Sequence, residues 1–418
     1  MNRSSSWLWA LFLSAAIISN ARSNDWPQFR GPLGNGHAVA KHLPVHWSTT
    51  ENVAWKQAIA GKGWSSPVIA NGRIYVTTAV PGSTNAGKDY SLRLIDLDVV
   101  SGKPGLDVQI FEEKGDTSPA IHRKNSHASP TPLVHGDRIY VHFGHQGTAC
   151  VDRSGKLIWQ NRNLSYPPVH GAGGTPVLVD DRLIFNCDGG TDPFIVALDA
   201  ATGDVAWKVD RATNAAKKFS FSTPIVIDVG GRKQVVTAGS DVVNALDPGT
   251  GKEIWHVRYD GYSVIPKPVF GHGMVYICTG YEKPTLQAIR ADGTGDVTDT
   301  HVVWTVDSGV PHTSSILLVG DHLFMVSDIG MASCLDAKTG TSIWQKRIGG
   351  NYSASPLYAN GLVYFQSEDG KTTIVKASPE YEVVATNSID ERTFASFAVS
   401  DNKLILRSEH HIYCIAEK

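Results

Sequence analysis

A ten-residue motif, Leu-Asp-x-x-Thr-Gly-x-x-x-Trp, occurs three times in the chain and limits the folds that it can adopt. The copies run from Leu198 to Trp207, from Leu246 to Trp255 and from Leu335 to Trp344. Trp159 and Trp304 extend the series at a period of about 48 residues. Periods of this length that contain several short strands are typical of β-propeller blades.

The residues between two tryptophans predict one blade in detail. Apolar runs bounded by turn residues indicate four strands, at 175–179, 183–187, 194–198 and 205–209. Asp199 can accept hydrogen bonds inside the turn that follows the third strand, and Gly203 can adopt a left-handed conformation there at little cost. Trp207 is broad and flat, which suits a spacer between sheets. The same structural roles are assigned to Asp247, Gly251, Trp255, Asp336, Gly340 and Trp344.

The number of inner strands gives the number of blades. They are expected to begin near Ser65, Ser129, Gly174, Phe221, Val264, Thr313, Ser353 and Phe394. The last unit has only three strands, whereas Val53 to Ala58 reads as a fourth strand with no blade before it. Pairing the two would close the ring and remove its open edges. We therefore predict an all-β, eight-bladed propeller of four-stranded blades, with residues 53–418 as a single domain.

The segments before this domain have their own interpretation. Residues 1–23 combine Arg3, an apolar run and small residues near Ser23, which predicts a cleaved secretory signal and a periplasmic or extracellular protein. Residues 24–52 are a Gly/Pro-rich lead-in segment that we expect to pack on the outside of the propeller. No later stretch is apolar enough for a transmembrane helix. The net charge of −2 and the lack of a basic stripe with interleaved aromatic residues argue against a nucleic-acid partner.

The repeated motif resembles that of the PQQ-like β-propeller repeat family, which includes the outer-membrane assembly factor BamB. Longer segments such as "WPQFRGP", "NSHASPTP" and "SASPLYANGLVYFQSEDG" look most similar to exported PQQ-like propellers of planctomycete-type bacteria. The resemblance covers nearly all of the chain after the signal and implies the fold strongly. It implies activity weakly, because one propeller fold carries many functions.

Two features separate the chain from characterised branches of this family. BamB-type factors are lipoproteins, and no cysteine lies near the expected cleavage site. Quinone-dependent dehydrogenases of the family carry two adjacent cysteines beneath the cofactor, whereas Cys150, Cys187, Cys278, Cys334 and Cys414 are all separate. We therefore expect no bound cofactor, and the PQQ-binding interpretation is disfavoured.

Candidate binding residues lie in the connections expected on one face of the ring. The fourth-to-first and second-to-third strand connections are long and polar, whereas the other face carries short repeated turns, and function concentrates on variable loops. The longest connection, 112–128, contains "PAIHRKNSHASP" and could form a basic lid over the axial opening or a solvated loop. The candidate residues are His122, Arg123, Lys124, His127, His145, Tyr262, Lys267, His312, Tyr352 and Arg392.

Catalytic and metal motifs are weak by comparison. The histidines lack the fixed spacing of a zinc site, and Asp292, Asp296 and Asp299 read better as an elongated turn than as a calcium loop. No catalytic residue or metal ligand is therefore assigned. We expect a secreted, non-catalytic scaffold that binds a protein or cell-envelope ligand through its long-loop face. A PQQ-dependent oxidoreductase or a polysaccharide-acting enzyme, with its site at the axial channel mouth, remains the alternative.

Overall fold

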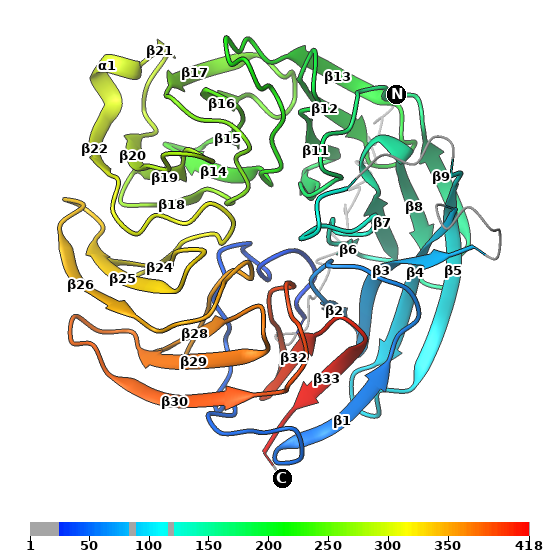
Figure 1. The fold of residues 1–418 in the computed structure, drawn as a ribbon. Coiled ribbons are helices and arrows are strands. Elements are labelled where there is room, and N and C mark those ends of the chain that lie inside the picture. The colour runs from blue at the N-terminus through cyan, green and yellow to red at the C-terminus, as the bar shows by residue number, and fades with distance from the viewer. Residues whose placement is uncertain (1–24, 83–88, 116–120, 418) are drawn as a thin grey trace, which may run out of the picture.

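The computed structural model describes residues 25–82, 89–115 and 121–417, and these form a closed ring of eight β-sheets around a central axis (Figure 1). The predicted signal lies outside the described residues. The ring confirms the expected all-β, eight-bladed propeller. Each blade is an antiparallel sheet. In blades 1 to 7 the strands follow chain order from the axis outward, whereas the outer strand of blade 8 is β1. Blade 4 gains β21 as a fifth, parallel strand.

The blades are numbered along the chain. Blade 1 contains β2 (Val68–Ala70), β3 (Arg73–Pro81), β4 (Tyr90–Asp98) and β5 (Pro104–Glu113), and blade 2 contains β6 (Leu133–His135), β7 (Arg138–His142), β8 (Thr148–Asp152) and β9 (Leu157–Asn161). Blade 3 contains β10 (Val177–Val179), β11 (Arg182–Cys187), β12 (Phe194–Asp199) and β13 (Val205–Asp210). Blade 4 contains β14 (Ile225–Val229), β15 (Arg232–Ala238), β16 (Val242–Leu246), β17 (Glu253–Arg258) and β21 (Gly295–Asp296).

Blade 5 contains β18 (Val269–Gly271), β19 (Met274–Cys278), β20 (Leu286–Arg290) and β22 (Val302–Val306), and blade 6 contains β23 (Leu317–Val319), β24 (His322–Val326), β25 (Met331–Asp336) and β26 (Ser342–Arg347). Blade 7 contains β27 (Leu357–Ala359), β28 (Leu362–Gln366), β29 (Lys371–Lys376) and β30 (Val383–Ser388). Blade 8 contains β31 (Ala398–Ser400), β32 (Lys403–Arg407), β33 (His411–Ile415) and β1 (Val53–Ala58). A 3-10 turn, Gly144–Gln146, and the short helix α1, Thr298–His301, interrupt the strands.

The ring closes as predicted. β1 pairs with β33, with Trp55 opposite Cys414, so the first strand of the chain is the outer strand of the last blade. Closure gives every sheet a neighbour on both sides and leaves no blade with an open inner face.

The repeated motif joins neighbouring blades, as its structural interpretation requires. The indole nitrogen of Trp159 in blade 2 donates to the carbonyl of Ala200, in the turn before the outer strand of blade 3, at 3.1 Å. The indole ring also covers Gly203, where a Cβ atom would lie 2.4 Å from the ring and where φ is +79°. Glycine is needed there for both reasons. Trp207 repeats the contact with Pro248 and Gly251, and Trp304 repeats it with Ala337 and Gly340.

Trp255 departs from this pattern because the next blade has an enlarged turn. Its indole donates to the side chain of Gln234 at 2.9 Å, and Gln234 in turn donates to the carbonyl of Ala291 in blade 5 at 3.3 Å. The Asp-rich run in this turn forms β21 and α1, which agrees with its interpretation as an elongated turn. Glutamine therefore replaces the direct contact between tryptophan and turn.

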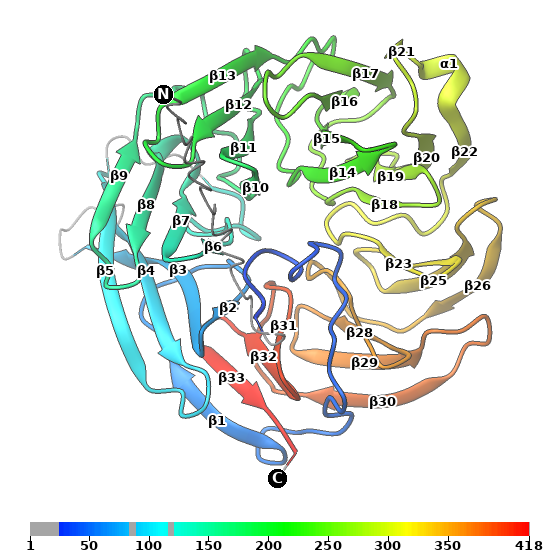
Figure 2. The ribbon, with the colours of Figure 1, turned by 180° about the vertical axis from the view of Figure 1, so that it is seen from behind.

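The lead-in segment crosses the ring instead of packing on its outside (Figure 2). Trp26 exchanges backbone hydrogen bonds with Ile69 of blade 1, and the carbonyl of Pro27 accepts one from Val134 of blade 2. Farther along, His37 Nε2 lies 2.7 Å from the carbonyl of Leu318 in blade 6, and Ala38 donates to Tyr358 of blade 7. Residues 26–38 thus span opposite sides of the ring on the face of the short first-to-second turns, called the turn face below.

Candidate functional site

An axial cavity of about 920 Å³ lies on the propeller axis, and every blade contributes to its wall. It is bordered by the fourth-to-first connections, which form the loop face, and Phe29 of the lead-in segment also lines it. The lining residues used below are Trp64, His122, Arg123, Lys124, His170, Lys217, Phe219, Phe221, Tyr262, Tyr281, His312, Asp328, Ser353 and Phe394.

The cavity wall combines aromatic rings with cationic groups. Trp64 packs against Phe394 with 4.6 Å between ring centroids, and Phe219 packs against His170 at 5.2 Å. Arg123, Lys124 and Lys217 supply positive charge, whereas Asp328 is the one carboxylate among the described lining residues. Such a wall favours a ligand with an anionic group and a flat or apolar surface.

Two pairs of polar side chains order part of the wall. His312 Nδ1 lies 2.8 Å from Asp328 Oδ2, and the Tyr281 ring is tilted against the imidazole with 5.3 Å between the ring centroids. Lys124 Nζ lies 2.7 Å from Glu368 Oε1, which also accepts a hydrogen bond from Ser353 at 2.6 Å. The second pair ties the connection before blade 2 to blade 7, across the cavity opening.

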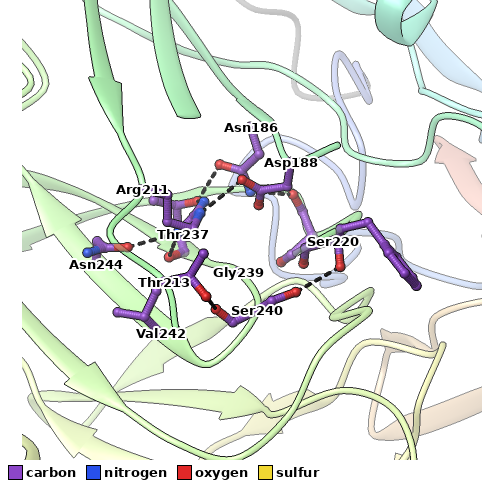
Figure 3. Close-up of polar contacts among 12 residues, drawn as sticks. Asn186, Asp188, Arg211, Thr213, Ser220, Thr237, Gly239, Ser240, Val242 and Asn244 are labelled. Atoms are coloured by element: carbon purple, nitrogen blue, oxygen red, sulfur yellow. Dashed lines mark hydrogen bonds and ion pairs between the residues drawn. The ribbon is translucent and has the colours of Figure 1, made fainter. Parts of the chain in front are cut away.

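A buried network supports the connection that carries Lys217, Phe219 and Phe221 (Figure 3). Arg211 Nε lies 2.9 Å from Asp188 Oδ1, and both side chains are fully buried. Arg211 also donates to Asn244 Oδ1 at 2.8 Å and to Thr237 Oγ1 at 3.0 Å. Burial raises the pKa of Asp188, and the nearby guanidinium opposes that effect. Because an isolated buried charge is costly, the pair fixes this connection in one arrangement.

The floor of the cavity is a ring of hydroxyl groups. In seven of the eight blades, the hydroxyl group of one residue just before the inner strand accepts a hydrogen bond from the backbone N–H of the corresponding residue in the preceding blade, at 2.9 to 3.1 Å. The accepting residues, called the hydroxyl ring below, are Ser66, Thr131, Thr175, Thr223, Ser315, Ser355 and Ser396. All of them line the cavity. Lys267 occupies the eighth position, in blade 5.

Lys267 and Arg30 lie beneath this floor. The Lys267 side chain is buried, and a Cβ atom on Gly34 of the lead-in segment would lie 2.4 Å from its Nζ. Arg30 is 2% exposed and has one hydrogen bond, from Nη2 to the carbonyl of Asn35 at 3.1 Å. Burial lowers the pKa of Lys267 to about 7 and that of Arg30 to about 9. Neither cation has a carboxylate partner among the described residues.

The structure brings half of the predicted binding residues together. His122, Arg123, Lys124, Tyr262 and His312 line the cavity. Residues 116–120 of the connection that carries the first three lie outside the described ranges.

The other five predicted residues do not line the cavity. His127 pairs with buried Glu113 at 2.8 Å, and His145 contacts the side chain of Gln146. Lys267 is beneath the floor, and Tyr352 is buried in the core between blades 6 and 7. Arg392 lies over Phe394 and near Glu409, at the edge of the opening. A loop position alone did not reveal which way each side chain points.

Sequence reasoning missed the aromatic wall and the hydroxyl ring. A signal for the ring was present, because a hydroxyl residue directly precedes a proline at the same position of five of the eight blades, at Ser66, Thr131, Thr175, Thr223 and Ser355. In the described ranges, no group of three or more His, Cys, Asp or Glu side chains is arranged to hold a metal ion. The five cysteines are buried and unpaired.

Comparison with known proteins agrees with the fold. The family model described as outer membrane protein assembly factor BamB, built from PQQ-type repeats, matches residues 41–191, 191–298 and 294–380. The chain belongs to this family of BamB-like propeller proteins. It is 25% identical to BamB of Yersinia pestis over 231 residues, which is 51% of each chain. It is also 28% identical to methanol dehydrogenase [cytochrome c] subunit 1 of Paracoccus denitrificans over 153 residues, or 31% of this chain and 23% of the relative.

Solved structures show the same fold at low sequence identity. BamB from Moraxella catarrhalis superposes with a TM-score of 0.57 and 13% identity, covering 87% of this chain and 99% of the other. A europium-containing methanol dehydrogenase gives 0.66 and 10%, covering 93% and 91%. The chain spans about half the length of the first BamB relative that it matches. No helix in the described ranges has the length and apolar character needed to cross a membrane.

Proposed function

We propose that the protein is an exported, non-catalytic scaffold that binds a cell-envelope ligand in the axial cavity of its loop face. The observation that carries the proposal is the cavity itself, which all eight blades line and which the lead-in segment underlies on the turn face. A pocket of this size with an aromatic wall and a few placed charges is typical of a ligand site. The BamB relatives, whose name describes outer-membrane assembly factors, support an envelope role.

The enzyme alternatives have weaker support in the cavity. The methanol dehydrogenase relatives favour a quinone site, but the donor set does not fit a metal-bound quinone. Asp328 is the one carboxylate among the described lining residues, and His312 already holds one of its oxygens. The His312–Asp328 pair resembles a base with its orienting group, yet no nucleophile in the described cavity is hydrogen-bonded to His312 Nε2.

Retention of envelope components by immobilised protein tests the proposal. Wild type is compared with Arg123→Ala/Lys124→Ala at the cavity opening, and with Lys338→Ala/Lys346→Ala as a control of equal charge change. Lys338 lies in a turn of the turn face, and Lys346 lies on the outer strand β26. We expect the same component to be retained by wild type and control and at least about tenfold less by the cavity variant. Equal retention by all three proteins would place binding elsewhere.

A further inference from the structure

The hydroxyl hydrogen atoms of the hydroxyl ring have no acceptor among the residues that the structure describes. Each hydroxyl oxygen accepts one backbone N–H from the preceding blade, which fixes its position. None of these hydroxyl groups donates to another atom of the described residues. All seven side chains are more than nine-tenths buried, and all face the cavity. A hydroxyl group carries one donor and two acceptor sites, so each retains a free donor at the cavity floor.

Positive charge accumulates beneath these donors. Lys267 interrupts the ring because an ammonium cannot accept the N–H of Thr223 as a hydroxyl would. Its backbone N–H still donates to Ser315 at 3.0 Å. Arg30 is close enough to affect the charge state of Lys267, and its Nε and Nη1 are buried without a partner. A buried cation without a carboxylate is costly unless the group loses its proton or an anion compensates its charge, and neither Lys267 nor Arg30 has a carboxylate partner among the described residues.

We propose that the cavity floor binds a tetrahedral oxyanion, sulfate or phosphate, either as the free ion or as the terminal group of a larger ligand. The donors of the hydroxyl ring and the charge beneath it supply what such an anion needs. Each ring hydroxyl also keeps one acceptor site, so the ring can receive the proton that phosphate retains at neutral pH as well as donate to unprotonated oxygens. This inference rests on the proposed function, because it assigns a ligand class to the same cavity.

The geometry also explains how a larger ligand would fit. The cavity of about 920 Å³ exceeds the volume of one tetrahedral anion, and its upper wall carries Trp64, Phe219 and Phe394. A sulfate ester would place its charged group on the floor and its sugar or aromatic part against this wall. Apolar and aromatic walls with a few directed polar groups bind ligands in this manner.

Calorimetric titration of the purified full chain with sodium sulfate tests the inference, at pH 7 and constant ionic strength with chloride as the balancing anion. Thr175→Val removes one hydroxyl and conserves shape, whereas Thr175→Ser keeps the hydroxyl. We expect saturable binding of one sulfate by wild type, at least about tenfold weaker binding by Thr175→Val, and near-wild-type binding by Thr175→Ser. Thr373→Val, a buried threonine of β29 outside the ring, is the matched control and should bind like wild type.

Further probes separate the two sources of sulfate. Tighter binding of glucose 6-sulfate than of inorganic sulfate would indicate an ester, and the reverse order would indicate the free ion. Phosphate should bind within about tenfold of sulfate at the same pH, because the ring offers both donor and acceptor sites to a tetrahedral anion, and a lack of phosphate binding would overturn the assignment to this shared chemistry. If Thr175→Val does not fold, Thr131→Val provides the same test in blade 2.

The outcome can be distinguished from that of the proposed function. A wild-type protein that shows no saturable heat with either sulfate probe refutes the oxyanion site, as does equal affinity in Thr175→Val and wild type. If the envelope component is still retained in that case, the scaffold function stands without this site. If the protein binds sulfate but retains no envelope component, the oxyanion site at the cavity floor is supported and the scaffold role is contradicted.

Discussion

Replacing Lys267 with Met should change how the stability of the protein depends on pH. Burial, and after it the positive charge of Arg30, lower the pKa of Lys267 from 10.5 to about 7 in the folded protein. Between these two values the unfolded chain holds a proton on Lys267 that the folded chain does not. The free energy of unfolding therefore rises with pH across this window. Methionine has similar length and no titration, so the variant lacks this contribution.

The size of the effect follows from the two pKa values. Between about pH 6.5 and about pH 9.5, Lys267 should add about 3 kcal/mol to the rise in the free energy of unfolding. Urea unfolding of wild type and Lys267→Met, followed by tryptophan fluorescence in buffers without sulfate or phosphate, measures the difference between the two pH profiles. Lys338→Met on the exposed turn face should leave the wild-type profile unchanged. Parallel profiles for wild type and Lys267→Met would show that Lys267 is solvated or paired, contrary to our reasoning.

Three further predictions concern the ring and its cofactor chemistry. Gly203→Ala should lower the free energy of unfolding by at least about 2 kcal/mol more than Gly72→Ala, because both glycines have similar positive φ but only Gly203 lies against Trp159. Chemical denaturation of both variants measures the difference. Equal losses would mean that the contact between Gly203 and the Trp159 indole does not contribute to stability. Deleting the chain through Ala58 removes β1 and should abolish cooperative thermal unfolding, so an unchanged melting transition would contradict the role of β1 in closure. Equilibrium titration with PQQ, with and without calcium, should show no tight binding, and stoichiometric binding with turnover of an alcohol would reverse the functional proposal.

The fold was largely predictable because its information is repeated. Asp199, Gly203 and Trp207 recur at fixed spacing, and most recurrences form the same contact between neighbouring blades, with Trp255 as the exception. Val53 to Ala58 was predictable as the closing strand. When four strands are assigned to each blade, this segment belongs to no preceding blade, and the last blade lacks one strand. Periodicity thus conveys both the local structure and the number of units.

The lead-in segment and much of the site were not predictable in the same way. Residues 26–38 occur once, so no repeat indicates where they bind, and their contacts with blades 1, 2, 6 and 7 depend on the finished ring. His127 and Tyr352 were candidates because they lie in loops or near strand starts. Their side chains are buried inside the protein, which the loop position does not show. The hydroxyl residues of the ring recur in the sequence, but the sequence does not show that they form one ring. That arrangement exists only where all the blades meet at the axis.

Ring closure also determines the order in which the protein can be completed. Among the strands that the structure describes, β1 is synthesised first and its partner β33 last, so β1 must remain unpaired while nearly all of the other blades form. The lead-in segment faces the same delay, because its contacts with blades 6 and 7 require strands near the other end of the chain. Until then the newly made chain presents two unpaired edges of compatible sequence, and these can pair between molecules as readily as within one. A low local concentration of folding chains therefore favours closure of the ring within one chain over pairing between chains.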